Sequence, residues 1–531
     1  MSNTSSFYEL FRNLILNSFE FTFIKYALGI IFSFFEFVFV IPAASTGASL
    51  IITVIIIPLC FLLVGFFFNS KNELFIKKYT LFCTILTFIA SLVLWYRFDY
   101  ATMGFQHVFE LPWFLLNGLE MNFIVGIDGV GLMFFLLTTF LMPICVLISW
   151  NSVTFRIKEY YLLLLLIEYL LLNVFVVLDL VFFYIFFESV LIPMFILIIV
   201  WGSRERKIHA AFQFFLYTLI GSVLMLLGIL TIINYLGSSD IRILLSTNFS
   251  KNLELILWLC FFFPFAVKMP MFPFHIWLPE AHVEAPTAGS VLLAGILLKL
   301  GTYGVLRILL PSFPYANSYF TPLVFTFAIL GIVYSSLATI RQIDLKKIIA
   351  YSSVAHMNFI LIGLFSVDPI AISGSIYLML SHGLVSSGLF ICVGILYDRY
   401  HTRLLEYYGG LVNYMPLFSS FFLFLSLANI GFPLTSSFVG ELLIMVGAFK
   451  FNAFAAILSG IGMITGACYA MWLYNRVVFG ELKIKYLTKF SDLNFVEYLA
   501  LFIICLFTLI TGVYVNPILK TFELYSLSCV V

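Results

Sequence analysis

Charged residues are scarce in this chain. Asp, Glu, Lys and Arg make up 10% of the 531 residues, whereas hydrophobic residues make up 63%. Ordinary globular domains have about a quarter of their residues charged. The 27 Lys and Arg residues nearly balance the 26 Asp and Glu residues, so the net charge does not indicate a nucleic acid or an acidic substrate as a partner. The composition excludes a typical soluble fold and predicts an integral membrane protein.

Cofactor motifs are missing as well. The eight cysteines stand singly, without the spacing of a zinc or iron–sulfur site. The nearest approach to a glycine-rich dinucleotide loop, at Gly460, Gly462 and Gly466, has the wrong spacing and lies in an apolar run. We therefore expect no metal, no NADH and no other cofactor to bind to this chain.

Long apolar runs recur along the sequence, and each is long enough to cross a hydrocarbon core of about 30 Å as a helix. They predict an all-α, polytopic membrane protein with about fourteen transmembrane helices. The helices are expected near residues 48–68, 78–96, 128–149, 160–178, 180–201, 210–235, 255–277, 288–310, 321–340, 348–366, 371–396, 413–449, 452–475 and 494–515.

The positive charges support this assignment. Connections on the cytoplasmic or matrix side of a membrane protein carry an excess of lysine and arginine. Most of the 27 positive residues fall in the odd-numbered connections, and one missed span would destroy this alternation. They are Lys71, Lys77, Lys78, Arg156, Lys158, Arg204, Arg206, Lys207, Arg341, Lys346, Lys347, Arg399, Arg403, Arg476, Lys483, Lys485 and Lys489.

Two of the predicted spans contain helix breakers. Pro270 and Pro273 follow Lys268 in the seventh span, and each proline deprives the carbonyl four residues earlier of its helical donor. Gly431 and Pro433 interrupt the twelfth span in the same way. The broken spans are the seventh and the twelfth, a shift of five helices, and because five is odd the two five-helix units would have opposite orientations. The pattern predicts an inverted repeat with broken helices; simple packing kinks are the alternative.

The expected segments follow from these breaks. An N-terminal extension carries an apolar stretch that is either an extra span or an interfacial helix, and three helices precede the repeats. The segments are 1–45 (extension), 46–158 (helices one to three), 159–310 (first repeat, helices four to eight), 311–476 (second repeat, helices nine to thirteen) and 477–531 (C-terminal segment with helix fourteen).

Charged side chains inside the spans are the candidate functional residues. Glu188, Lys268 and Lys299 fall within predicted helices. A lone charge in lipid costs several kcal/mol, so it must be neutralised, paired or hydrated. Because burial favours the neutral form of both residue types, these groups can exchange protons near neutral pH. A structural ion pair that holds helices together is the alternative interpretation.

Further titratable residues lie around the second break. Glu441 follows it by two helical turns, and His356 and His382 lie in the tenth and eleventh spans. Histidine can gain and lose a proton near neutral pH, so the two histidines are expected to form a hydrated relay between the lysines and Glu441. The alternative is that they are hydrogen-bonded core residues. Glu168 in the fourth span is a weaker member of the set. A solvated loop is expected for His275, Glu280, His282 and Glu284.

Three sequence runs together identify a family. They are DLVFFYIFFESVLIPMF at 179–195, KMPMFPFHIWLPEAHVEAPTAGSVLLAG at 268–295 and AHMNF at 355–359. Over about residues 48–515 the chain resembles the M-type antiporter-like subunits (subunit 4) of respiratory complex I, the proton-pumping NADH:quinone oxidoreductase. The resemblance implies that Glu188 and Lys268 are a coupled pair, that Lys299 is the central relay and that Glu441 is the terminal site. It also implies a fourteen-helix inverted-repeat fold.

The expected function is therefore proton translocation in the membrane arm of NADH:ubiquinone oxidoreductase, as a subunit without a redox centre of its own. NADH, FMN, iron–sulfur clusters and quinone would bind to other subunits. The expected partners are other membrane-arm subunits, including antiporter-like siblings, and membrane lipids, but no nucleic acid. The expected location is the mitochondrial inner membrane, with a bacterial or plastid membrane as the alternative. A subunit of a Mrp-type cation/proton antiporter is the alternative function, and a passive structural subunit is the third.

Overall fold

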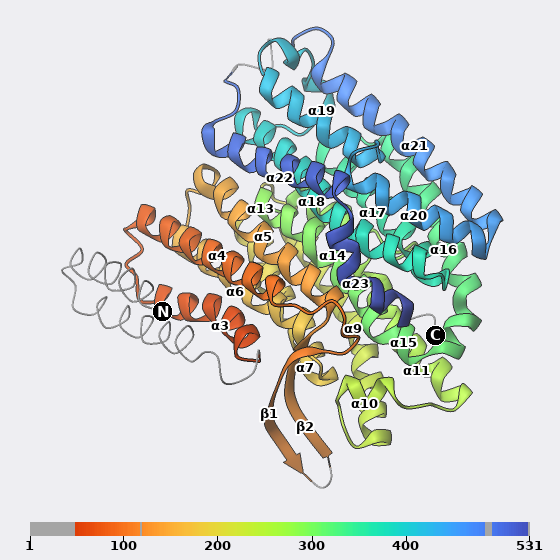
Figure 1. Cartoon of the computed structure of the whole chain (residues 1–531). Coiled ribbons are helices and arrows are strands. Elements are labelled where there is room, and N and C mark those ends of the chain that lie inside the picture. Colours follow the sequence, from red (N-terminus) through yellow and green to blue (C-terminus); the bar gives the residue numbers. More distant parts are fainter. Residues whose placement is uncertain (1–47, 117–118, 484–490, 529–531) are drawn as a thin grey trace.

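The computed structural model describes residues 48–116, 119–483 and 491–528, which form a bundle of long helices (Figure 1). Eleven of the described helices are long and apolar enough to cross a membrane. The extension expected at residues 1–45 lies outside the described residues.

The first part of the bundle contains four helices and a hairpin. α4 and α5 are long, apolar helices of 24 residues each. The elements are α3 (Ala48–Gly65), α4 (Glu73–Tyr96), β1 (Gln106–Leu116), β2 (Leu119–Ile127), α5 (Gly129–Ser152) and α6 (Ile157–Val176).

The hairpin is a departure from the expected all-α fold. β1 and β2 are antiparallel, with Gln106 opposite Ile127 and Phe109 opposite Val125. Figure 1 shows the hairpin projecting from one end of the bundle. Aromatic and β-branched residues favour a pleated, half-buried strand, but each strand is too short to register as a membrane span. A search for helical spans alone therefore treats this segment as a loop.

The next part carries the first break. The expected span at 180–201 is divided into two shorter helices, and the expected span at 255–277 ends early at Lys268. The elements are α7 (Leu180–Ser189), α8 (Leu191–Trp201), α9 (Lys207–Leu236), α10 (Ile241–Leu245), α11 (Lys251–Lys268) and α12 (Trp277–Glu284).

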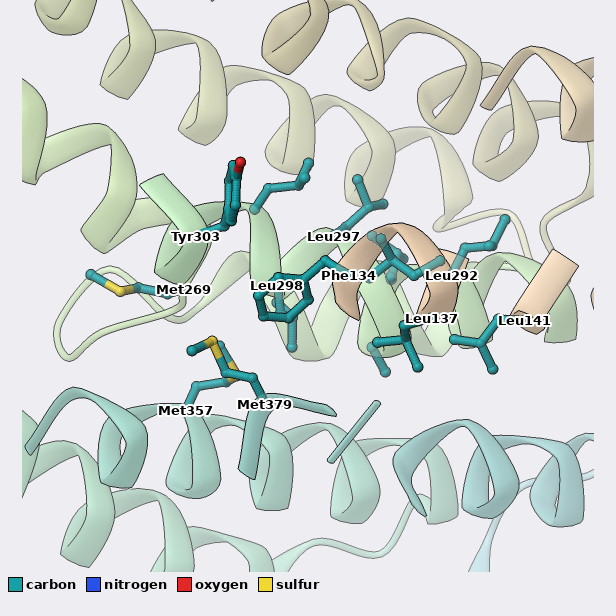
Figure 2. Packing of buried hydrophobic residues seen from close by; sticks show 14 of the residues in the cluster. Phe134, Leu137, Leu141, Met269, Leu292, Leu297, Leu298, Tyr303, Met357 and Met379 are labelled. Carbon is teal, nitrogen blue, oxygen red and sulfur yellow. The ribbon is translucent and has the colours of Figure 1, made fainter. Parts of the chain in front are cut away.

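A continuous helical rod at residues 287–312 runs through the centre of the bundle. It alternates between α-helical and π-helical turns, and its most apolar 18-residue stretch is entirely buried. The rod consists of α13 (Thr287–Leu292), η1 (Leu293–Leu297), α14 (Leu298–Gly304), η2 (Val305–Leu309) and α15 (Leu310–Ser312). Figure 2 shows how Leu297 and Leu298 of this rod pack among Phe134 of α5, Met357 and Met379.

The remaining helices surround the other side of the rod. The expected span at 413–449 is two helices, α19 and α20, and α23 is a C-terminal helix that was not expected. The elements are α16 (Pro314–Arg341), α17 (Leu345–Phe365), α18 (Pro369–Tyr400), η3 (Leu405–Tyr407), η4 (Leu411–Asn413), α19 (Pro416–Ile430), α20 (Ser436–Phe451), α21 (Ala453–Val478), α22 (Phe495–Val513) and α23 (Asn516–Ser528).

Each of the expected spans overlaps a helix or a pair of helices, so the predicted helical character is confirmed. In the described ranges, eleven helical stretches meet the length and apolarity of a span when Leu180–Trp201 and Thr287–Ser312 each count as one, and the membrane crossing of the shorter helices stays a prediction. The inverted repeat and the segment boundaries likewise remain predictions. What matters for the site is that both expected breaks exist, one between α11 and α12 and one between α19 and α20.

Candidate functional site

The first break leaves carbonyl groups at the end of α11 without helical donors, as the two prolines predict. The protein supplies the missing donors. The backbone N–H of Met271 donates to the carbonyl of Ala266 at 3.0 Å. The indole Nε1 of Trp277 donates to the carbonyl of Val267 at 2.9 Å. The end of α11 is therefore held by protein groups, including a side chain from α12 on the other side of the break.

Lys268 is the last residue of α11, and its ammonium group lies against α7. Its Nζ is 3.9 Å from Oε1 of Glu188 and donates to the carbonyl of Phe187 at 2.6 Å. The same nitrogen lies 3.1 Å from the centre of the Phe187 ring, in a cation–π contact. Glu188 is one residue before the end of α7. The structure thus brings Glu188 and Lys268 together at the ends of two helices.

Lys299 lies at the centre of the buried rod, between its two π-helical segments. Its side chain is fully buried. The Nζ donates to the carbonyl of Ala294 at 2.5 Å and lies 2.8 Å from Nδ1 of His382 on α18. Single π-helical turns are frequent at functional sites because they disturb the regular backbone ladder. Here they flank a lysine that contacts a histidine 83 residues away.

The polar contacts continue from His382 to the second break. The rings of His382 and His356 have centres 5.6 Å apart. Nδ1 of His356 lies 3.6 Å from Oε1 of Glu441 on α20. Lys299, His382, His356 and Glu441 therefore form a continuous series of neighbours that passes from the central rod through α18 and α17 to α20.

The second break is shaped by a glycine. α19 ends at Ile430, and Gly431 has a φ of +80°, a left-handed conformation that favours glycine. A Cβ atom on Gly431 would lie 2.2 Å from Oε2 of Glu441. The backbone at the break can approach the carboxylate only because this residue has no side chain.

A small cavity adjoins Glu441. Its volume is about 30 Å³, and its polar lining groups come from four helices. The lining residues are Ile332, Ala355, His356, Phe359, Asn429, Ile430, Glu441, Gly462, Met463, Gly466 and Tyr469. Among the described residues, Oε2 of Glu441 has no hydrogen-bond partner although it is buried.

Glu168 stands apart from this series. Its side chain is fully buried, and Oε1 accepts a hydrogen bond from the Thr87 hydroxyl at 2.6 Å. Within the described ranges, no hydrogen bond or ion pair joins Glu168 to Glu188 or Lys299.

The expectation of a solvated loop around residues 275–284 is wrong for three of its four residues. His275, His282 and Glu284 are buried, and residues 277–284 form α12, which packs against α9 and α17. His282 stacks on Phe390 with ring centres 4.6 Å apart. Only Glu280 is partly exposed, and it pairs with Lys347 at 2.6 Å. Polar residues next to prolines suggest a loop, but here most of them belong to α12, a short helix with mostly buried side chains.

A buried cluster near this helix was also missed, because its positive residues were counted as members of solvated connections. Nζ of Lys346 donates to the carbonyl of Ala285 at 2.8 Å, and the lysine is buried. Arg403 is fully buried and lies 3.5 Å from Glu284 and 3.9 Å from Asp344. The alternation of charge along the sequence gives no sign of which loop residues turn inward.

In the part of the chain that the structure describes, no group of three or more His, Cys, Asp or Glu residues could hold a metal ion.

Comparisons with known proteins give the family. Residues 177–468 match the family described as "NADH:quinone oxidoreductase/Mrp antiporter, TM". NADH-ubiquinone oxidoreductase chain 4 from Marchantia polymorpha is 59% identical over 426 residues, which are 80% of this chain and 86% of that protein. NADH-quinone oxidoreductase subunit M from Rhodobacter capsulatus is 46% identical over 451 residues, which are 82% of this chain and 87% of that protein.

Comparison with solved structures is consistent with this family. A chain of respiratory complex I from Thermus thermophilus with bound NADH has a TM-score of 0.81 and 28% identity, over 90% of this chain and 99% of that chain. A chain of the Mrp complex from a Dietzia species has a TM-score of 0.78, over 90% of this chain and 98% of that chain. Its identity of 18% shows a shared fold alone. The chain thus belongs to the NADH:quinone oxidoreductase/Mrp antiporter family, among its chain 4 and subunit M members.

Proposed function

We propose that this chain is a proton-translocating subunit in the membrane arm of NADH:ubiquinone oxidoreductase, and that it is a multi-pass protein of the mitochondrial inner membrane. The family membership and the buried charged residues support this function. The chain takes part in the enzyme reaction as a subunit, and the redox groups belong to its partners. Those groups are NADH, FMN, iron–sulfur clusters and quinone.

One observation carries the proposal: the series of ionisable neighbours Lys299, His382, His356 and Glu441 in the interior of an apolar bundle. Each member can release or accept a proton, and burial makes an isolated charge there costly. Lys299 can donate a proton to Nδ1 of His382, since the two nitrogens lie 2.8 Å apart. The proton then moves by way of His356 to Glu441, and from Glu441 out of the protein.

A change in the pairing of Glu188 and Lys268 starts proton transfer along this series. Quinone reduction in another subunit would change the pairing of these two residues at the end of α11. Helix α11 packs against α14, and the backbone of Met269 lies next to Gly301, two residues from Lys299. A rearrangement at Lys268 therefore acts on the segment that holds Lys299. Moving one charge against about 100 mV requires about 2.3 kcal/mol, which a proton-affinity change of about two pKa units can supply.

The two breaks fit an organisation of two inverted five-helix repeats, residues 159–310 and 311–476, each with its own broken helix. The partners are the other membrane-arm subunits, including antiporter-like siblings, and lipids that cover the apolar outer helices. A role in a Mrp-type antiporter has weaker support, since the likeness to that complex extends to the fold alone. Isolation of the chain in a native complex without flavin and iron–sulfur subunits would favour the antiporter.

The test of the proposal is proton transport by the assembled complex in liposomes, measured with a pH-sensitive dye beside NADH oxidation. Lys299→Ala removes the centre of the series, and proton transport should fall about a hundredfold, since a positioned acid or base commonly contributes a factor of about 10² or more. Lys450→Ala is the control, because Lys450 is exposed and pairs with Asp368 at 3.5 Å away from the series. Normal transport by Lys299→Ala, and also by Lys299→Ala combined with Glu441→Gln, would instead support a passive structural subunit.

A further inference from the structure

A second buried charge pair lies on the same rod as Lys299 and outside the series described above. Nη1 and Nη2 of Arg307 donate to the two carboxylate oxygens of Asp128, at 2.8 and 2.9 Å. Both side chains are buried, and Cζ of the guanidinium lies 4.6 Å from the centre of the Phe105 ring. Asp128 is also the N-cap of α5 and accepts from the N–H of Gly131. Because a bidentate pair holds its partners in one geometry, it joins the rod to the start of α5.

The pair lies near the outer end of the rod, where outer means the side opposite the connections rich in lysine and arginine. The rod ends at Ser312 and α16 begins at Pro314, in the eighth and therefore even-numbered connection of the predicted spans. Asp128 follows the second connection, which is even-numbered too. Arg307 is two helical turns beyond Lys299, about 12 Å along a helix. The pair is thus placed between Lys299 and the outer side.

An aromatic layer lies between Lys299 and Arg307. Tyr303 is four residues from each of them, a spacing that places the three side chains along one face of the rod. Its ring centre is 5.9 Å from that of Phe134 on α5 and 5.1 Å from that of Phe175 on α6. The rings of Phe134 and Phe175 stack with their centres 5.5 Å apart. All three rings are buried, so three helices contribute to one apolar layer.

The polar atoms around this layer are bonded to one another. The hydroxyl of Tyr303 donates to the carbonyl of Phe175 at 2.9 Å and accepts from Nε of Arg307 at 3.2 Å. Within the described residues, neither Asp128 nor Arg307 nor Tyr303 has a buried side-chain nitrogen or oxygen without a hydrogen-bond partner. Glu441, at the end of the series, does have such an atom. A water that carried a proton past the pair would therefore have to break existing bonds.

These residues form what we call the outer barrier: Asp128, Phe134, Phe175, Tyr303 and Arg307. We propose that the outer barrier insulates Lys299 from the outer side of the membrane, so that protons do not return to this lysine along the rod. Arginine stays protonated in proteins, so Arg307 cannot relay a proton as the members of the series can. An arginine in a narrow path is also an electrostatic barrier to protons and cations. This inference rests on the proposed function.

The first test replaces the charge pair. Arg307→Gln combined with Asp128→Asn removes both charges together, so that neither is left buried alone, and asparagine keeps the N-cap of α5. The matched control is Arg399→Gln combined with Glu497→Gln. Nη2 of Arg399 lies 2.7 Å from Oε2 of Glu497, and this pair joins α18 to α22 at the opposite side. Glutamine can keep the capping box of α22.

The second test replaces a ring and leaves every charge in place. Phe134→Leu thins the aromatic layer. Phe140→Leu is its control, because Phe140 lies on the same helix and is buried, but its ring contacts Phe88 and Phe507, at 5.8 and 4.6 Å. All variants are measured as the assembled complex in liposomes. Passive proton entry is followed with a pH-sensitive dye under a potassium diffusion potential without NADH, and protons transported per NADH oxidised are measured separately.

The double variant of Arg307 and Asp128 should admit protons about tenfold faster than wild type, and Phe134→Leu about two- to threefold faster. Both should transport fewer protons per NADH while NADH oxidation continues, because protons flow back. Both controls should match wild type. Passive entry no faster than in the controls would overturn the outer barrier; if the double variant does not assemble, Phe134→Leu beside Phe140→Leu decides. The proposed function fails by a different result, normal NADH-driven transport in Lys299→Ala, which the passive measurement does not use.

Discussion

The two broken helices carry their charges in different ways. At the first break, Lys268 has an acidic partner at 3.9 Å, a carbonyl at 2.6 Å and an aromatic ring at 3.1 Å. At the second break, Glu441 has a histidine at 3.6 Å, and its Oε2, like Oε1 of Glu188 at the first break, is buried without a hydrogen-bond partner among the described residues. The first charge is enclosed by protein groups, and the second lies beside a cavity of about 30 Å³.

This difference suits the two breaks to different steps of proton transport. A charge that an acidic partner, a carbonyl and an aromatic ring enclose is suited to store a change of state, because separating a buried pair is costly. A carboxylate with a free oxygen next to a cavity is suited to take up and release a proton, because water can reach it. We infer that the change in charge pairing that starts proton transfer occurs at the first break, and that protons leave the series at the second break.

The largest effect should come from breaking the first pair. Glu188→Gln leaves Lys268 buried without an anion, which costs about 3 kcal/mol, the lower end of the range for a buried pair. The amount of assembled complex on native gels should fall, and proton transport should be lost. Glu188→Gln combined with Lys268→Met removes both charges, so assembly should return while transport stays lost. If transport returned with assembly, the pair would be purely structural.

A smaller effect is expected from crowding the second site. Gly431→Ala places a Cβ 2.2 Å from Oε2 of Glu441 and must displace the carboxylate. Proton transport should fall about tenfold, a change equivalent to about 1.4 kcal/mol. Gly480→Ala is the control for backbone strain, because Gly480 has a φ of +93° but no described atom lies within 4 Å of its Cβ position. Equal losses in both variants would assign the effect to strain rather than to Glu441.

The smallest effect should come from loosening the first break without touching a charge. Trp277→Phe removes the indole that donates to the carbonyl of Val267 at 2.9 Å, and an unsatisfied buried carbonyl costs about 1–3 kcal/mol. Trp258→Phe loses a comparable bond, to Asn317 at 2.8 Å, away from the break. Both variants should lower the melting temperature of the complex, but only Trp277→Phe should lower transport, by about two- to threefold. The same transport in both would mean that the geometry of the break does not affect coupling.

The positions of the helices could be predicted from the sequence, but the β-hairpin and the burial of residues between the helices could not. Spans follow from apolar runs, and breaks follow from Pro270, Pro273 and Gly431, because both are local properties of the chain. The β-hairpin was missed because strand signals are weaker than span signals. Lys346 was expected in a solvated connection and is buried instead, since the side a loop residue faces depends on its neighbours.

The same holds for the site: its charged residues could be predicted from the sequence, but their contacts could not. Glu188, Lys268, Lys299 and Glu441 could be selected from the sequence because charge in an apolar run is costly wherever it occurs. The contacts of Lys299 with His382 and of His356 with Glu441 could not, nor could the presence of Tyr469 in the lining of the cavity. These contacts join residues up to 85 positions apart.

Hydropathy and helix-breaking residues by themselves determined that this chain is a helical membrane protein with ionisable groups inside it. Only the tertiary structure decided which of those groups are neighbours. The reason is physical: the hydrogen bonds of a helix are made within one segment, so local sequence specifies them. Contacts between helices depend on how all the side chains of the bundle pack together.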